Sequence, residues 1–446
     1  MTTNSSVLGG VERPSSGALV TLSFGIVVAM WSVGYVGRLP AVMLPSPVLL
    51  IVLLACMTAG GLVAGRRTGR GFGFGAAVGA LVGTVNLLVL GSLLTGDQPN
   101  RLLPSAAVWV LGSIAVTAAL VGLGASFGAR SPAERPTDWP ALLVRIAVLA
   151  TLLLVAVGGL VTSHEAGLAV VDWPNSYGYN MFLYPLARMT GGIYYEHAHR
   201  LFGALVGLTT VVTAAMLQRY EHRRWVRVLA WVAVGMVVVQ GILGGLRVTG
   251  EFTWSDDPAD TRPSAPLAVV HGVFGQVFLA TLVGLAVFTS AAWRRGRDTL
   301  WRRPAPADRA LGIVLCAVLV AQIALGALQR HTASLLLLHV VLACVVAPLA
   351  LAVGLRGWAL YADDPQSRRT GIALMVVTGV QVLLGVGAYI ATGAGGVGPE
   401  SRVLDITLAT AHQWCGAVLL GLAVTATLWN FRPLRAHLAS AGSAGA

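Results

Sequence analysis

The chain consists largely of apolar runs of about 20 residues, the length that an α-helix needs to cross the hydrocarbon core of a bilayer. Hydrophobic residues make up 56% of the 446 residues and charged residues only 11%, whereas soluble domains carry about 25% charged residues. The pattern predicts an all-α polytopic membrane protein. The twelve candidate spans are 17–36, 44–65, 72–95, 105–128, 142–162, 195–217, 228–248, 266–289, 310–329, 334–355, 370–391 and 406–429.

The net charge of +12 comes entirely from arginine, because the chain contains no lysine. A net positive charge of this size can indicate nucleic-acid binding or membrane topology, and the positions of the arginines distinguish the two. With the twelve spans, 22 of the 30 arginines fall on one side of the membrane. The positive-inside rule makes that side and both termini cytoplasmic, and nucleic acid is excluded as a partner. The opposite loops carry acids, including Glu251, Asp256, Asp257 and Asp260.

The cysteines and the leader add little chemistry. Each of the four cysteines stands alone in an apolar span, so no disulfide framework is expected. The first apolar run follows a nearly neutral, serine-rich leader and is expected to be a plain first span rather than a cleaved signal.

A linker at 128–145 separates four spans from eight. Residues 1–130 are expected to form a four-span module of packing or accessory character. Its Gly75, Gly79 and Gly83 form a ladder of small residues that predicts close helix approach.

The eight remaining spans contain an internal repeat. A histidine followed four residues later by glycine or alanine occurs four times, and the matched copies are 140 and 141 residues apart. The segments "QGILGG" and "QVLLGV" repeat at the same offset, and "QIALGA" is a third copy. The repeat predicts two tandem four-helix units, 139–290 and 308–432. The four histidines are His199, His271, His339 and His412.

Histidine and a small residue at this spacing favour haem as a ligand. Residues four apart lie on one helix face, so each helix presents an imidazole beside a patch without a side chain. All four helices enter from the outer face, with each histidine within about the first seven residues of its span. The second and fourth helices of a unit can face each other, which predicts one bis-histidine haem per unit near the outer face, with His199 opposite His271 and His339 opposite His412.

The first unit carries a carboxylate that the second lacks. Glu196 lies three residues before His199, whereas Leu336 takes that position before His339. A carboxylate in a poorly hydrated site is a candidate proton acceptor, and pairing with Arg200 is the alternative. Arg200 and Arg330 are candidates to pair with haem propionates or to anchor the helices at the interface.

The outer side of the predicted membrane domain carries further histidines and one long loop. His197 is expected at the surface, because it points away from His199, and the spare His164 and His331 are expected to be solvated. The aromatic outer loop 162–192 is long enough to suggest function, and we expect it to cover the first site.

At these residues the chain resembles the haem A synthase family, over about 139–432. Departures from the family are Val161 and Thr162, where many members have threonine and arginine, and the absence of an outer-loop cysteine pair. The matching stretches are "VGGLVTSHEAGLAVVDWP", "EHAHR", "QGILGG", "HGVFGQ", "QIALGA", "LLHVVLA" and "HQWCGA".

The resemblance implies an enzyme of the bacterial cytoplasmic membrane that oxidises the C8 methyl group of haem O to a formyl group, giving haem A for cytochrome oxidase. It implies a resident haem b between His339 and His412 and the haem O substrate between His199 and His271, with Glu196 as the catalytic carboxylate. It also suggests haem O synthase and cytochrome oxidase assembly factors as partners.

Two other functions remain open from the residues alone. A dihaem b-type cytochrome that transfers electrons from quinol needs the same histidines but neither Glu196 nor the long loop. A twelve-span transporter without haem needs none of them, and the purified protein would then show no Soret band.

Overall fold

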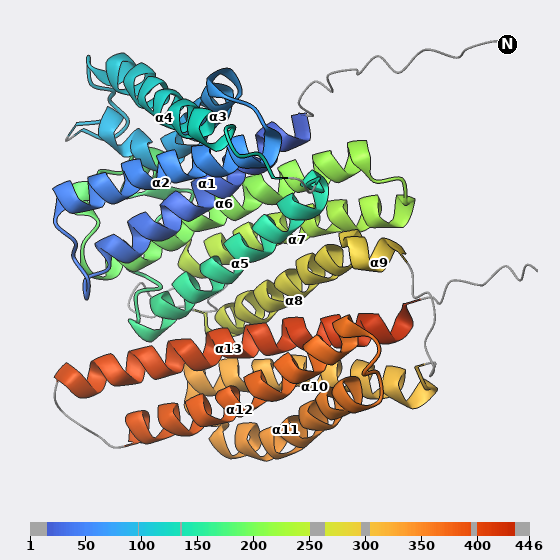
Figure 1. The fold of residues 1–446 in the computed structure, drawn as a ribbon. Helices are drawn as coiled ribbons and strands as arrows, with labels where there is room; N and C mark the ends of the chain where they lie inside the picture. Colours follow the sequence, from blue (N-terminus) through green and yellow to red (C-terminus); the bar gives the residue numbers. More distant parts are fainter. Residues whose placement is uncertain are drawn as a thin grey trace, which may run out of the picture. The chain divides into compact units, whose positions relative to one another are not determined.

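The computed structural model describes residues 16–96, 98–133, 136–249, 264–295, 304–393 and 399–432. Within these ranges, twelve helices are long and apolar enough to cross a membrane (Figure 1). The predicted all-α polytopic membrane fold is therefore confirmed. Several charged residues of the predicted loops lie outside the described ranges, among them Glu251, Asp256, Asp257, Asp260, Arg13, Arg135, Arg297, Arg302, Arg303 and Arg435.

The chain divides into two compact units, residues 1–90 with 103–146, and residues 91–102 with 147–446. The first unit contains the predicted glycine ladder, which is a packing surface between α3 and α4. A Cβ on Gly79 would lie 2.5 Å from the Thr117 carbonyl oxygen, and one on Gly83 would lie 2.9 Å from the Ile114 Cα, so larger residues would separate the helices. The helices of this unit are α1 (Ser16–Arg38), α2 (Ser46–Thr68), α3 (Phe72–Leu90) and α4 (Ala106–Gly128).

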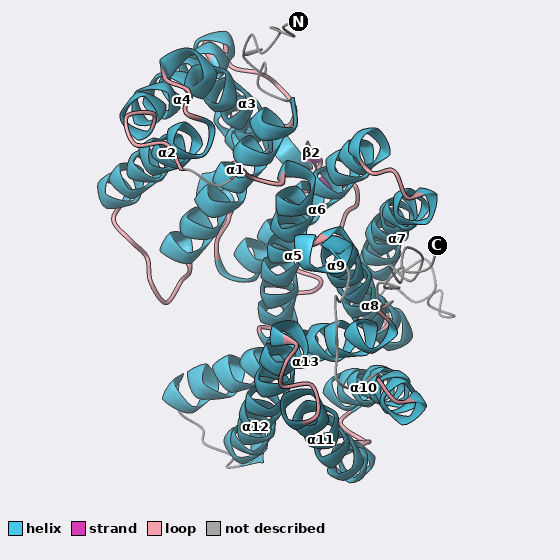
Figure 2. Cartoon of the chain, turned by 45° about the vertical axis from the view of Figure 1, so that its right-hand side comes forward, coloured by secondary structure: helices cyan, strands magenta, loops and turns pink. Residues whose placement is uncertain are grey.

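The second unit contains two four-helix bundles, α5–α8 and α10–α13 (Figures 1 and 2). The helix α5 begins in the first unit and continues into the second. The helices are α5 (Trp139–Ser163), α6 (Gly191–Tyr220), α7 (Arg224–Thr249), α8 (Ala265–Thr289), the short α9 (Ala291–Arg295), α10 (Pro306–Thr332), α11 (Leu336–Ala359), α12 (Pro365–Gly393) and α13 (Pro399–Phe431). The loop segments are η1 (Gly91–Leu94), β1 (Asn175–Ser176), β2 (Tyr179–Asn180), η2 (Met181–Leu183) and η3 (Leu186–Arg188).

Polar contacts and helix packing join the two bundles. The helix α8 packs against α10 and α13. The Trp414 indole donates to the Leu152 carbonyl at 3.0 Å, and the Thr410 hydroxyl donates to Ser163 at 2.9 Å, so α13 also contacts α5. The second unit therefore provides one scaffold for both histidine pairs.

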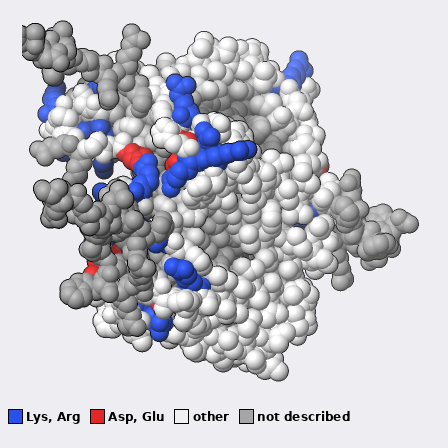
Figure 3. All heavy atoms as spheres, turned by 90° about the vertical axis from the view of Figure 1, so that its right-hand side faces the viewer, with Lys and Arg blue, Asp and Glu red and all other residues white. Residues whose placement is uncertain are grey.

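The outward-facing side chains of the helices are largely apolar. Leu337 is 79% exposed and Leu383 72% exposed, which is expected where lipid replaces water as the solvent. In the face shown in Figure 3, charged side chains are few and a broad uncharged surface surrounds them.

Two helices begin earlier than their apolar runs. Because α6 begins at Gly191 and α13 at Pro399, His199 is the ninth residue of its helix and His412 the fourteenth. The prediction that every histidine falls within about the first seven residues is wrong for these two helices. The reason is that hydropathy marks the apolar section of a helix, whereas polar residues extend the helix beyond it.

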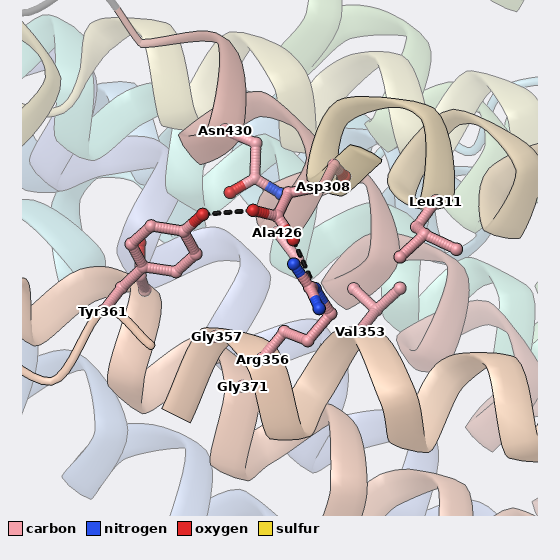
Figure 4. A pocket seen from close by; sticks show the side chains of 10 residues that line it. Asp308, Leu311, Val353, Arg356, Gly357, Tyr361, Gly371, Ala426 and Asn430 are labelled. Atoms are coloured by element: carbon pink, nitrogen blue, oxygen red, sulfur yellow. Dashed lines mark hydrogen bonds and ion pairs between the residues drawn. The ribbon is translucent and has the colours of Figure 1, made fainter. Parts of the chain in front are cut away.

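A polar cluster lies at the end of the second bundle where α10 begins and where α11 and α13 end (Figure 4). The buried Asp308 carboxylate accepts hydrogen bonds from Arg356 and Tyr361, and Asn430 donates to the Asp308 carbonyl at 3.3 Å. Burial and the hydrogen bond to Asp308 raise the pKa of the Tyr361 phenol. These hydrogen bonds connect α10, α11 and α13 at one end of the bundle.

Candidate functional site

The four histidines meet in two pairs, one in each bundle. The ring centroids of His199 on α6 and His271 on α8 lie 6.2 Å apart, with an angle of 76° between the ring planes. Those of His339 on α11 and His412 on α13 lie 6.3 Å apart, at 77°. The structure thus brings together the two pairs expected from the repeat, in nearly the same geometry.

Each imidazole lies against a glycine of the preceding helix. A Cβ at these glycines would come within 2.8 to 3.2 Å of the Cε1 atom of the ring, so any side chain there would displace the histidine. Sequence reasoning missed this role, although the repeated "QGILGG", "QIALGA" and "QVLLGV" segments contain three of the four glycines. The pairs are Gly158 with His199, Gly244 with His271, Gly326 with His339, and Gly385 with His412.

The glycines four residues after the histidines behave differently from one another. A Cβ on Gly203 would meet nothing within 4 Å, as the prediction of open space requires. At Gly275 and Gly416 the nearest atom is the side-chain amide of Gln240 or Gln381, 2.7 and 3.4 Å from the Cβ position. Glutamines of the preceding helix therefore fill part of the space that the sequence predicted to be free.

Glu196 is buried at the start of α6, with 5% of its surface exposed. Its carboxylate accepts a hydrogen bond from the Arg200 Nε at 3.2 Å, so the ion pair considered from the sequence is present. The matched residue of the second bundle, Leu336, is 37% exposed and carries no charge. The two histidine pairs therefore differ in charge although they agree in geometry.

The guanidinium of Arg200 also holds the long loop between α5 and α6. It donates to the carbonyl oxygens of Val170, Asp172 and Asn175 at 2.7 to 2.9 Å. In the structure this side chain therefore serves the loop and Glu196 together.

The loop covers the end of the first bundle near the histidine pair. The Trp173 ring lies against Gly245, the neighbour of the glycine that contacts His271. His164 stacks on Tyr195 with ring centroids 3.9 Å apart, and burial, with a smaller contribution from Arg402, lowers the pKa of His164. His164 is half-buried, so the prediction of a solvated residue is wrong for it.

His197 corrects the sequence prediction of a surface residue. It is 1% exposed, lies 3.1 Å from the Ser176 hydroxyl through its Nδ1, and packs against the Tyr184 ring at 4.9 Å. The prediction was wrong because the loop folds over this face of α6, which a helix considered alone would leave exposed.

Arg247, near the end of α7, is a site residue that sequence reasoning missed. It lies within electrostatic range of Glu196, His199 and His271, and its guanidinium contacts the loop at Gly167. Its buried Nε has no hydrogen-bond partner within the described chain. The available signal was a lone charge inside the predicted span 228–248, since such residues are usually functional.

Arg330 lies at the seam between the bundles. It is exposed and donates to the Thr162 carbonyl, the penultimate residue of α5, at 3.0 Å. His331 beside it is half-buried rather than solvated.

Among the described residues, no group of three or more His, Cys, Asp or Glu side chains is arranged to hold a metal ion. A haem requires less of the protein, because the porphyrin supplies four ligands and the protein adds only the axial ones. Two histidines per bundle therefore form a sufficient donor set.

Fold and site together define a multi-pass membrane protein with a histidine pair inside each of two repeated four-helix bundles. Residues 140–338 match the model of the COX15-CtaA family, described as cytochrome oxidase assembly protein. The match contains Glu196, His199 and His271 and ends one residue before His339. No curated protein and no solved structure matches the chain.

Proposed function

We propose that the protein is a haem A synthase, which oxidises the C8 methyl group of haem O to a formyl group in successive hydroxylations. The second bundle holds a resident haem b between His339 and His412. The first bundle receives haem O between His199 and His271. The family match supports a role in cytochrome oxidase assembly. The resemblance noted in the sequence implies that this role is the supply of haem A.

One observation carries the proposal: a buried carboxylate stands one helical turn from one histidine pair and is missing from the other. Glu196 and Leu336 occupy equivalent positions in the repeat, each three residues before a paired histidine. The two bundles therefore share the same helix arrangement but differ in this side chain. Two haems that only passed electrons would not require it. A reacting haem requires a group that accepts protons beside it.

The residues fit a porphyrin with two axial imidazoles. With about 2 Å for a metal–nitrogen bond and roughly 1 Å from that nitrogen to the ring centre, two such rings place their centres about 6 Å apart. The separations of 6.2 and 6.3 Å agree with this value. The glycines behind the imidazoles also allow the rings to remain close to their helices.

The haem groups, when bound, supply the redox chemistry, and the surrounding side chains manage protons and charge. Oxidation of the methyl group to a formyl group takes its oxygen from water or O2 and releases protons and electrons, so it also requires an external electron acceptor. Glu196 is the buried carboxylate of the first site and would accept the protons. Arg200 holds that carboxylate in position and ties the loop over the site, which excludes water. Arg247, a cation without a hydrogen-bond partner at its Nε in the described chain, pairs with a carboxylate of the substrate.

The test is direct conversion. Purified protein or membranes are supplied with haem O, and the extracted haems are separated by reversed-phase chromatography. The proposal expects haem A and its hydroxylated precursor. A protein with a normal Soret band that returns only haem O would contradict it.

A second function, that of a dihaem b-type cytochrome, is favoured by the near-identity of the two histidine pairs. It predicts rapid reduction of both haems by a quinol without any change in the haem extracted. The same preparation distinguishes the two functions, because only a synthase changes the chemical identity of the haem. A protein without a Soret band after expression with ample haem would instead favour the transporter.

A further inference from the structure

A loop from the part of the chain before the family match packs against the long loop 162–192 that covers the first site. This α3–α4 loop, residues 91–102, connects two helices of the first compact unit, yet it belongs to the second unit itself. Its 3₁₀ turn η1 packs against η2 of the long loop. The family match begins only at residue 140, so the α3–α4 loop lies outside it.

The α3–α4 loop contacts backbone atoms of the long loop. The buried Thr95 hydroxyl donates to the Leu183 carbonyl at 2.7 Å. A Cβ on Gly91 would lie 2.5 Å from the Phe182 carbonyl oxygen, so the two backbones lie too close together for a side chain. Thr95 also forms an antiparallel bridge with Leu102, which closes the α3–α4 loop into a compact turn. The loop is therefore shaped to fit η2.

Asn100 holds the hairpin that β1 and β2 form within the long loop. Its side-chain amide donates to the Gly178 carbonyl at 3.0 Å, and its side-chain oxygen accepts from the Asn180 backbone N–H at 2.6 Å. Both ends of one amide are used, which fixes the hairpin in position and in orientation. Asn100 has a φ of 61°, a conformation that asparagine adopts more readily than most residues.

The same hairpin contacts the residues of α6 beside the first site. The Arg200 guanidinium donates to the Asn175 carbonyl at 2.9 Å and to the Glu196 carboxylate at 3.2 Å. The Ser176 hydroxyl lies 3.1 Å from the Nδ1 atom of the buried His197. The hairpin therefore connects the α3–α4 loop to the ion pair of the first site.

We propose that the α3–α4 loop is a positioning element of the first site, with Thr95 and Asn100 as the positioning residues that keep the long loop closed. In the closed arrangement Arg200 bonds the loop carbonyls and Glu196 together, and water is excluded from the reacting group. Loops with fewer anchoring contacts open at a lower cost in free energy. The catalytic consequence rests on the proposed function, whereas the anchoring itself does not.

The experiment measures how often the long loop opens in the purified full-length protein. Val170 lies in this loop with no exposed surface, so the thiol of Val170→Cys reacts with a water-soluble maleimide only when the loop opens. The unsubstituted protein gives the background from the native cysteines. Adding Thr95→Val and Asn100→Leu removes three hydrogen bonds to the long loop and should speed labelling by about tenfold.

Matched variants separate anchoring from a general loss of stability. Thr95→Ser keeps the hydroxyl donor and should label at the rate of Val170→Cys alone. Gln98→Leu changes an exposed residue that bonds Arg101 within the α3–α4 loop, and it should also leave the rate unchanged. The haem b of the second bundle should be retained in every variant. Should the double variant lose it, the exposed Asn100→Leu alone decides, with a smaller rise in labelling expected.

A second measurement follows the reaction in protein with the native Val170. Thr95→Val with Asn100→Leu should lower kcat for conversion of haem O by about tenfold, since small displacements near a reacting group are costly. KM should change little, because the histidines that bind the haem are unaltered. Gln98→Leu should keep the wild-type kcat.

The outcomes separate the inference from the function. Labelling of the variants at the rate of Val170→Cys alone would overturn the anchoring, and faster labelling with an unchanged kcat would overturn the positioning role. If the wild-type protein converts no haem O, the proposed function fails, and the labelling rates still decide whether the α3–α4 loop holds the long loop closed.

Discussion

At the scale of single residues, the absence of a side chain sets the position of each histidine. A helix that carried any Cβ at Gly158, Gly244, Gly326 or Gly385 would press on the Cε1 edge of the neighbouring ring. The steric clash would displace the imidazole ring, because the closely packed helices cannot move apart without disturbing the whole bundle.

This contact predicts a selective loss of haem from the second bundle. Gly385→Val should displace the His412 ring, since even a Cβ there would lie 2.8 Å from the ring. The affinity of the second bundle for haem should fall at least about tenfold. Losing a group that only orients a metal ligand already costs about this much, and here the ligand itself is displaced. Absorption spectra measure this, with Gly379→Val as the control, because a Cβ on Gly379 meets nothing within 4 Å.

The carboxylate of Glu196 gives a second prediction at this scale. Glu196→Gln keeps the shape and removes the base, so conversion of haem O should slow by about 100- to 10,000-fold while both haems still bind. The exposed loop carboxylate Glu165 provides the control, and Glu165→Gln should convert haem O normally. Wild-type conversion by Glu196→Gln would remove this carboxylate from the mechanism.

At the scale of elements, the loop between α5 and α6 is organised by contacts that hydropathy does not encode. It is held by Arg200 on α6 and by residues 91–102, where Thr95 donates to the Leu183 carbonyl at 2.7 Å and Asn100 donates to the Gly178 carbonyl at 3.0 Å. The sequence predicted the length and aromatic character of this loop, but not that it would bury His197. His197 is buried by a loop outside its own helix, so the sequence of that helix alone could not predict its burial.

Removing the central anchor should open this loop. Arg200→Gln loses three hydrogen bonds to loop carbonyls and the partner of Glu196. We expect faster cleavage of the loop by an externally added protease and reduced conversion of haem O, with the haem of the second bundle retained. Arg219→Gln, an exposed arginine near the other end of α6, is the control and should be cleaved at the wild-type rate. Unchanged loop cleavage in Arg200→Gln would contradict the anchoring role.

At the scale of the whole molecule, the internal repeat explains why the histidine pairs were predictable. A duplicated four-helix unit places matched residues at matched positions, so four scattered histidines reduce to one arrangement used twice. Arg247 and the glutamines were harder to predict, because their meaning depends on which helices become neighbours. The length of an apolar run indicates that a helix crosses the membrane. It does not indicate which of its side chains will face a histidine ring on the next helix.

The same repeat predicts that each bundle holds its haem independently. Both histidines of the second pair come from α11 and α13, and the buried apolar cluster of this bundle, including Leu315, Val346 and Leu374, comes from its own helices. His339→Ala or His412→Ala should therefore remove the haem b of the second bundle and leave binding to His199 and His271 intact. Pyridine haemochromogen assays should show about half of the wild-type haem after saturation with haem b, since one of two bis-histidine sites is lost. His222→Ala, at an exposed residue, should retain all of it. Full haem content in both His339→Ala and His412→Ala would show that these imidazoles do not bind iron, and the assignment of the second site would fall.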